Sequence, residues 1–271
     1  MKVYKYALIL FFMGIGLLSL NAQNKPSPLP LKIGMAGWTF NQFSLDTTLA
    51  VLRQLDVKYL CVKDFHLPLN STDEEMKAFR KKLAESNVIP YGVGPIYMRS
   101  KEQVDASFAY AARLGVKLVV GVPDYDLLPY VEQVVKKYDI KLAIHLHGPG
   151  SRCYPNATDI WDRVKDMDPR MGICLDIGHN LRDTQNPIDD YLKYHTRVFD
   201  IHIKDITEAT KDGHGIEFGR GLINFPGLAH ALVKMHYDGV CSLEYEKDMD
   251  NPFMGVAQSI GYFQGVCAVE E

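Results

Sequence analysis

Eight short apolar segments alternate with eight longer amphipathic segments along the chain. The short segments are rich in Val, Ile and Leu and show little alternation with polar residues, which is typical of parallel strands covered on both faces. Alternating strands and helices indicate a parallel α/β architecture. Because eight such units within residues 31–271 match the roughly 250 residues of a closed (β/α)8 barrel, we predict one α/β domain with a single closed parallel sheet, the TIM barrel fold.

The segment boundaries follow from the apolar runs and from helix-start signals such as Ser71 or Thr72, either of which could cap the helix that follows. No GxGxxG or GxxxxGK[ST] motif follows a predicted strand, which excludes the usual nucleotide-binding sheets. The predicted strands are 31–35, 59–62, 88–93, 117–121, 141–145, 172–175, 198–203 and 240–243. The predicted helices are 46–54, 73–85, 101–114, 127–138, 157–165, 188–194, 225–236 and 251–263.

The N-terminal segment has the layout of a cleaved secretory signal. Lys2 and Lys5 precede the apolar run 7–18, and a small residue, Ala22, ends the segment. We therefore expect residues 1–22 to be a signal peptide, residues 23–30 to be an extended lead-in, and the mature protein to be secreted or periplasmic. The apolar run is shorter than the roughly 20 residues that span a bilayer, so no membrane span is expected after cleavage; an uncleaved anchor is the alternative.

Charge and cysteine content limit the binding partners and the disulfides that we expect. The formal net charge of −3 gives no basic bias, so we expect no nucleic-acid partner. The five cysteines are an odd number, and a core of this size does not need disulfides. Cys153 and Cys267 lie outside the predicted strands, and whether either of them forms a disulfide is left open. The sequence also leaves a homo-oligomer open.

Polar side chains stand at the ends of the last four predicted strands, where the active sites of barrels are built. His145, Asp176, His202 and Glu244 each lie at or next to such an end. Ionisable groups in a packed barrel interior need partners, and one divalent cation would satisfy all four. Two imidazoles and two carboxylates suit Mn better than Ca, with Co, Fe, Zn or Mg as alternatives.

Other interpretations remain for each residue alone. His145 and His147 are two residues apart and share a face, so spacing does not decide which of them binds metal, although we prefer His145. Asp176 could cap the next helix. Glu244 could pair with Lys63 or Lys204, and a single histidine at a strand end could simply be hydrogen-bonded.

Nearly the whole mature chain resembles the sugar isomerase/epimerase family of xylose-isomerase-like TIM barrels, although only its second half carries specific motifs. The resemblance rests on residues 143–148 (AIHLHG), 174–179 (CLDIGH), 200–205 (DIHIKD) and 242–244 (SLE). It implies Asp176, His202 and Glu244 as metal ligands and His179 as a substrate contact. Residues 219–225 (GRGLINF) resemble the family's loop after the seventh strand. The expected substrate-binding residues are His179, Lys63, His66, Arg220 and Trp38.

The chain departs from the family pattern at the fifth strand, where His145 stands in place of a glutamate. In the family's epimerases that glutamate and the eighth-strand glutamate exchange the substrate's proton from opposite faces, so the two-glutamate reaction is in doubt. An imidazole can bind metal and move protons. The expected catalytic residues are Glu244 as base, His145 or His147 as the opposing acid, and Lys204 holding a substrate oxygen.

The leading functional prediction is a metal-dependent isomerase or epimerase that abstracts a proton next to a sugar carbonyl. The first alternative is a metal-dependent lyase or hydratase acting on keto-sugars or glycosides, because the same first step can expel a leaving group. A second alternative is a sugar-binding barrel without catalysis. DNA repair by an apurinic endonuclease, which the same fold also supports, is disfavoured by the acidic net charge and the signal.

Overall fold

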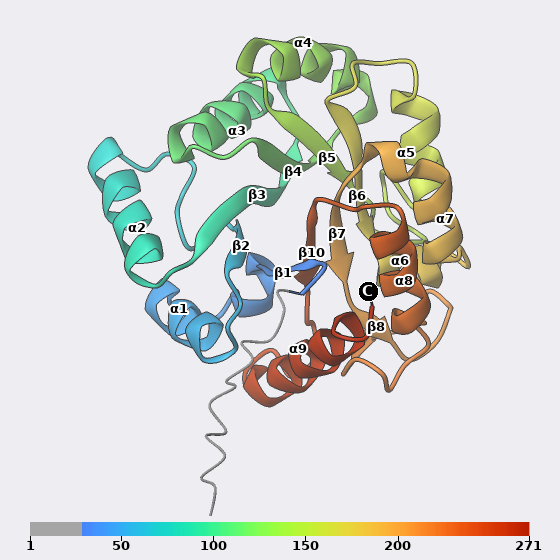
Figure 1. The fold of residues 1–271 in the computed structure, drawn as a ribbon. Helices are drawn as coiled ribbons and strands as arrows, with labels where there is room; N and C mark the ends of the chain where they lie inside the picture. The colour runs from blue at the N-terminus through green and yellow to red at the C-terminus, as the bar shows by residue number, and fades with distance from the viewer. Residues whose placement is uncertain (1–28, 271) are drawn as a thin grey trace, which may run out of the picture.

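The computed structural model describes residues 29–270, and in it eight parallel strands close into a barrel (Figure 1). The order around the barrel is β1-β10-β7-β6-β5-β4-β3-β2, so each strand pairs with its neighbours in sequence and the last pairs with the first. The predicted TIM barrel is therefore confirmed. The barrel strands are β1 (Lys32–Ala36), β2 (Tyr59–Val62), β3 (Ile89–Met98), β4 (Leu118–Pro123), β5 (Lys141–His145), β6 (Met171–Asp176), β7 (Val198–Ile203) and β10 (Val240–Leu243).

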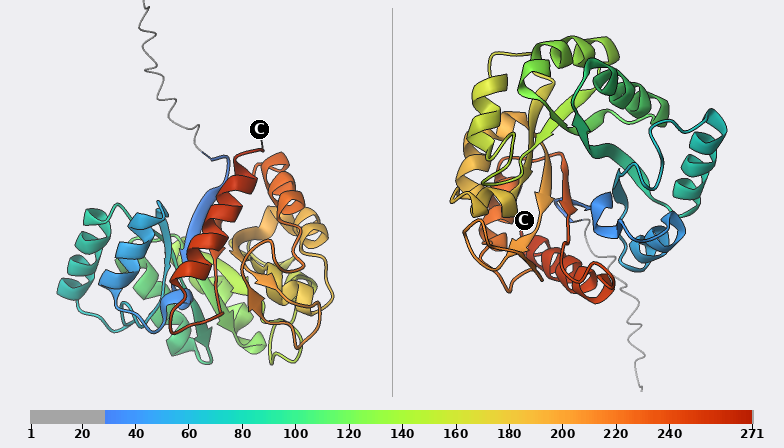
Figure 2. Two further views of the ribbon diagram at one scale, coloured as in Figure 1. Left: turned by 90° about the horizontal axis from the view of Figure 1, so that it is seen from below. Right: turned by 180° about the vertical axis from the view of Figure 1, so that it is seen from behind.

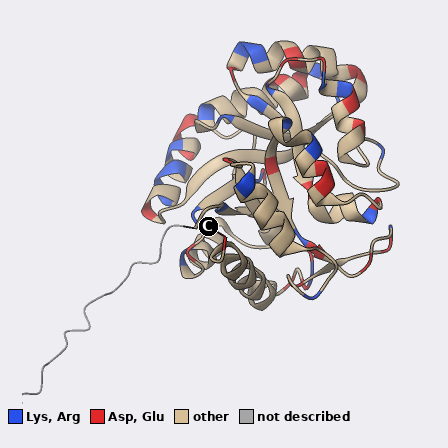
Figure 3. Ribbon diagram, turned by 45° about the vertical axis from the view of Figure 1, so that its right-hand side comes forward, with Lys and Arg blue, Asp and Glu red and all other residues tan. Residues whose placement is uncertain are grey.

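Helices surround the barrel, and most of them contain residues of both charge signs, whereas the C-terminal helix contains none (Figure 3). Each helix returns the chain to the start of the next strand, so both ends of the described chain lie on one side of the barrel, as the left view of Figure 2 shows. The main helices are α1 (Leu45–Gln54), α2 (Asp73–Glu85), α3 (Lys101–Leu114), α4 (Leu128–Tyr138), α5 (Ala157–Val164), α7 (Pro187–Tyr194), α8 (Phe225–Lys234) and α9 (Phe253–Cys267).

The start of α2 is fixed by a capping box. Thr72 Oγ1 accepts a hydrogen bond from the Glu75 amide at 3.2 Å, and the Glu75 carboxylate accepts one from the Thr72 amide at 2.7 Å. Thr72, and not Ser71, is therefore the cap. Without these bonds, the amide N–H groups of Thr72 and Glu75 would be unpaired donors at the start of the helix.

Strand β3 continues five residues beyond its predicted end at residue 93. The predicted boundary is wrong, because Gly94-Pro95, a pair of a kind that commonly marks a turn, does not end this strand. The strand instead passes through this dipeptide with a shift in its register against β4 between Val93 and Ile96, where a residue without an amide proton is tolerated. This extension carries Tyr97 to the rim of the barrel.

Two short elements that the sequence did not predict follow the site-bearing strands. Helix α6 (Ile177–Arg182) begins directly after β6, and its first turn is capped by the Asp176 carboxylate, which accepts from the His179 amide at 2.8 Å. The strands β8 (Asp205–Ile206) and β9 (Gly215–Ile216) form an antiparallel pair in the loop after β7.

Several N-terminal expectations fall on residues that are not described. The signal peptide and most of the lead-in lie outside residues 29–270, so they stay predictions. No helix within the described range has the length and apolar character needed to cross a membrane. All five cysteines are buried and free, so Cys153 and Cys267 are not joined.

We expect Thr72→Ala to lower the free energy of unfolding by about 1 kcal/mol, because the capping hydrogen bond is lost. Urea denaturation of the purified protein measures this. The control is Lys77→Ala on the same helix, at an exposed position, which should change stability by less than about 0.5 kcal/mol. Equal effects of the two substitutions would contradict the assigned cap.

Candidate metal centre and pocket

The four residues predicted as metal ligands converge at one point. His145 and Asp176 end β5 and β6, His202 lies on β7, and Glu244 follows β10. Asp176 pairs with His202 in the strand register, which sets their side chains next to each other. One ligand atom from each of the four residues lies within 4.8 Å of all the others.

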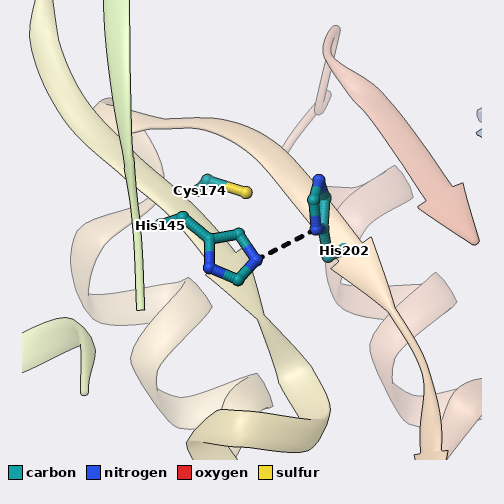
Figure 4. Close-up of side chains that lie close together, drawn as sticks. All are labelled: His145, Cys174 and His202. Carbon is teal, nitrogen blue, oxygen red and sulfur yellow. Dashed lines mark hydrogen bonds between the residues drawn. The ribbon is translucent and has the colours of Figure 1, made fainter. Parts of the chain in front are cut away.

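The distances between these atoms are those of groups that face a common centre. His145 Nε2 lies 3.0 Å from His202 Nδ1 (Figure 4) and 3.6 Å from Asp176 Oδ2. Glu244 Oε2 lies 3.4 Å from His202 Nδ1 and 4.0 Å from His145 Nε2. All four side chains are buried.

The donor set fits a divalent cation. Among residues 29–270, the buried atom Asp176 Oδ2 makes no hydrogen bond of good geometry, although the ammonium of Lys204 lies 3.1 Å away, and a cation would give this buried oxygen a further partner. Two imidazole nitrogens and two carboxylate oxygens suit Mn, Fe, Co or Zn. These four residues would therefore hold a metal ion without rearrangement of the barrel.

His147 stands apart from the cluster, above it. Its Nε2 lies 2.8 Å from the hydroxyl of Tyr97, and its ring centre lies 4.6 Å from that of His145. The geometry therefore favours His145 as the ligand and places His147 beside whatever occupies the pocket.

Cys174 precedes Asp176 by two residues on β6, so its side chain lies on the same face of the strand, deeper in the barrel. Figure 4 shows its sulfur pointing toward the two imidazoles, and one ligand atom each from Cys174, His145 and His202 lie within 4.8 Å of one another. Burial raises the pKa of this thiol. Without a metal ion it is therefore a neutral neighbour of the cluster.

Lys204 supplies a positive charge to the carboxylates. Its Nζ lies 2.8 Å from Glu244 Oε2, 3.1 Å from Asp176 Oδ2 and 2.8 Å from Glu246 Oε2. Burial alone raises the pKa of Asp176 and of Glu244, but the ammonium of Lys204 and the neighbouring histidines together outweigh burial and lower both pKa values. The two carboxylates are thus ionised. Of the two lysines proposed as partners of Glu244, Lys204 does pair with it, although Glu244 also belongs to the cluster. Lys63 instead pairs with Asp64, with 2.5 Å between Nζ and Oδ1.

The histidines that face the pocket are neutral. Burial lowers the pKa of His145 to about 4, that of His147 to about 3 and that of His179 to about 4. Neutral imidazoles offer one lone pair each, which can bind a metal ion or accept a hydrogen bond from a hydroxyl group.

A cavity of about 180 Å³ opens above the cluster at the carboxyl ends of the strands. It is smaller than the roughly 300–1,000 Å³ of sites for drug-sized ligands. Of the residues predicted to bind substrate, Trp38, Lys63 and His179 line it. Its full lining is Trp38, Lys63, Pro95, Tyr97, His145, His147, His179, Glu244 and Glu246.

The sequence analysis missed Tyr97 and Pro95 as pocket residues. Both follow residue 93, where the strand was predicted to end. A rim tyrosine two residues after a Gly-Pro pair carries no signal that distinguishes it from a surface residue. Tyr97 is 50% exposed and contacts His147. It reaches the pocket because β3 extends to Met98.

His66 and Arg220 do not line this cavity. The Nε2 of His66 lies 3.0 Å from the Phe43 carbonyl oxygen and 3.3 Å from the Thr48 hydroxyl, which tie its ring to the β1–α1 connection. Arg220 donates to Gln258 of α9 at 2.8 Å.

The course of the loop after β7 explains the position of Arg220. The carboxylate of Asp205 accepts hydrogen bonds from the amides of Gly219, Gly221 and Ile223 at 2.9–3.0 Å. These bonds fold residues 219–223 back on the end of β7. The arginine between the two glycines therefore points outward.

Comparison with known proteins places this geometry in context. The family model of xylose isomerase-like TIM barrels matches residues 49–265. No protein of curated function matches the sequence significantly.

Three solved structures share the fold at low sequence identity. The IOLI protein with a bound zinc atom is 17% identical over 88% of this chain and 98% of its own, with a TM-score of 0.71. A sugar phosphate isomerase/epimerase from Parabacteroides distasonis is 18% identical over 90% and 97%, with a TM-score of 0.68. The probable 3-DHS dehydratase AsbF from Bacillus anthracis is 10% identical over 89% and 100%, with a TM-score of 0.68. At these identities the likeness concerns the fold alone.

Lys204→Met should destabilise the metal-free protein by roughly 3–5 kcal/mol, because it leaves two buried carboxylates without their cation. Added Mn²⁺ should then raise the unfolding temperature of the variant more than that of the wild type. Thermal unfolding with EDTA and with Mn²⁺ measures both effects.

The control for this experiment is Lys211→Met, at a side chain that is 73% exposed and pairs only with Asp212. It should change the stability by less than about 0.5 kcal/mol. A Lys204→Met protein that matches the wild type in EDTA would show that the ammonium does not balance the carboxylates.

Proposed function

Since the chain belongs to the xylose isomerase-like TIM barrel family, we propose that it is a metal-dependent enzyme that removes a proton next to the carbonyl of a sugar. The observation that carries the proposal is the buried cluster of His145, Asp176, His202 and Glu244 at the base of a small pocket. Isomerisation or epimerisation is the outcome that the family favours.

A divalent cation bound by the four residues would polarise the sugar's carbonyl and stabilise the negative charge that develops on its oxygen atoms. The protein's own groups then have separate tasks. Lys204 keeps the carboxylates of Asp176 and Glu244 ionised and fixed. The neutral imidazole of His179 lines the pocket, where it can accept a hydrogen bond from a sugar hydroxyl.

Proton transfer needs an acceptor and a donor that face the substrate. Glu244, which follows β10, lines the pocket and is the proposed base: its carboxylate takes the proton from the carbon next to the carbonyl, the C–H electron pair forms a carbon–carbon double bond, and the carbonyl's π pair moves onto its oxygen. His147, which follows β5, and Tyr97 of β3 form a hydrogen-bonded pair elsewhere on the barrel rim. Return of a proton to the former carbonyl carbon, with the hydroxyl proton moving to the former carbonyl oxygen, gives an isomer. Return of a proton to the original carbon from its opposite face gives an epimer.

The pocket lining supports an unphosphorylated sugar as substrate. Trp38 and Tyr97 offer exposed aromatic faces on which a sugar ring can stack. No arginine lines the cavity within the described part of the chain, and its one lysine, Lys63, pairs with Asp64. The carboxylates of Glu244 and Glu246 would repel a phosphate group, whereas they can accept hydrogen bonds from hydroxyl groups.

A lyase or hydratase reaction is the second candidate, and the residue at position 145 favours it. A histidine there removes one of the two opposed carboxylates that exchange a proton in the family's epimerases. If the charge formed after proton removal instead expels a group from the next carbon, the sugar gains a carbon–carbon double bond and the group leaves with the electron pair. One first step thus serves both candidates.

Glu244→Gln should reduce turnover at least about a hundredfold, because the proposed base is lost. The protein loaded with Mn²⁺ is incubated with unmodified and keto-sugars in D₂O, and products are analysed by NMR. Deuterium on carbon without loss of a group indicates an isomerase or epimerase, and release of a group indicates a lyase. The control Glu74→Gln, on exposed helix α2, should keep full activity. A wild-type protein that binds a sugar but exchanges no proton would leave only a binding role.

Trp38→Ala should raise the KM for the sugar by about three- to tenfold with little change in kcat, because stacking stabilises the ground state and the transition state alike. Trp38→Phe keeps an aromatic face and should retain most of the affinity. Steady-state kinetics of the two variants measure the difference. An Ala variant with unchanged KM would show that the sugar does not stack on this residue.

A further inference from the structure

Beneath the candidate metal cluster, β7 places a second carboxylate in the barrel interior. Asp200 precedes His202 by two residues, so both side chains point to the same side of the strand. Asp200 is fully buried, and its Oδ2 lies 3.4 Å from His202 Nε2. The other ring nitrogen, Nδ1, lies 3.0 Å from His145 Nε2. The imidazole of His202 therefore stands between the cluster and Asp200.

The other partners of Asp200 are neutral. The Tyr91 hydroxyl lies 3.0 Å from its Oδ1 and 3.1 Å from its Oδ2, and the Cys174 thiol lies 3.7 Å from Oδ2. Tyr91 also contacts the hydroxyl of Ser242. No Lys or Arg of residues 29–270 lies within ion-pair distance of Asp200, so His202 is its one partner that can carry a positive charge. A buried carboxylate without such a partner is costly.

We infer that Asp200 is a positioning residue that holds the Nε2–H of His202 and thereby directs the Nδ1 lone pair toward the cation. The inference rests on the proposed metal site. A neutral imidazole carries its proton on one nitrogen and a lone pair on the other, so the group at Nε2 decides which atom is free at Nδ1. Metal-binding histidines commonly donate their second N–H to a carboxylate, which also raises their basicity.

The same geometry argues against a purely structural role. Tyr91, Ser242 and Cys174 can satisfy Asp200 only as neutral donors, and a buried acid held by such donors alone could be replaced by an apolar residue without loss of stability. The atom that would then lack a partner is His202 Nε2, which is buried, lies 3.4 Å from Asp200 Oδ2 and makes no hydrogen bond to any other described residue. The need to position His202 therefore explains why the carboxylate of Asp200 is buried below the cluster.

The test is the metal affinity of Asp200→Asn, measured by isothermal titration calorimetry with Mn²⁺ and with Co²⁺ on the full-length mature protein. We expect the Kd for each metal to increase by about 10- to 100-fold, the usual effect of losing such a partner. Asp200→Leu, which removes the acceptor altogether, should bind metal at least as weakly, and the visible spectrum of its Co²⁺ form should differ from that of the wild type. Circular dichroism and thermal unfolding establish that each variant is folded.

Tyr91→Phe is the matched control, because it removes a neutral donor to Asp200 but leaves the carboxylate beside His202. Its Kd should stay within about threefold of the wild type, as expected for loss of one neutral hydrogen bond. Folded Asp200→Asn and Asp200→Leu proteins with wild-type affinities and an unchanged Co²⁺ spectrum would overturn the inference. A wild-type protein that binds neither metal would instead refute the proposed metal site itself, so the two failures are distinguishable.

Discussion

The central constraint on this structure is the cost of burying charge inside a closed barrel. Strand β7 directs Asp200 and His202 inward, and Lys204 follows at its end, so three successive interior positions carry ionisable groups where a barrel normally packs branched apolar side chains. Such groups are tolerated only when their charges compensate one another. The side chains that the neighbouring strands place beside these groups meet that requirement.

Compensation is organised in layers along the barrel axis. At the upper layer, the ammonium of Lys204 lies between the carboxylates of Asp176 and Glu244. In the middle, two imidazoles approach each other to 3.0 Å. Below them, Asp200 is surrounded by hydroxyl and thiol groups. The buried groups therefore compensate one another's charge, and the cluster can exist without metal while still presenting four donor atoms to one.

This arrangement also sets the character of the pocket. Its base holds the paired charges of the cluster, and aromatic rings and neutral imidazoles line it together with Lys63, which pairs with Asp64, and Glu246, which pairs with Lys204. A ligand that enters meets hydrogen-bonding groups and flat apolar faces, which suits a hydroxylated ring. Outside the pocket, the backbone of the loop after β7 is fixed by Asp205, and Arg220 in that loop points away from the pocket.

The sequence alone determined the barrel and the four strand ends that carry the cluster, because both depend on local periodicity. An apolar run of four to six residues followed by an amphipathic segment specifies a strand and its helix, and a spacing of two residues specifies a shared face. Only the tertiary structure decided which side chains meet. The extension of β3 through Gly94-Pro95 brought Tyr97 to His147, and the folding of residues 219–223 on Asp205 took Arg220 out of the pocket. Loop paths and register shifts depend on contacts between residues distant in the chain, and no local pattern encodes those contacts.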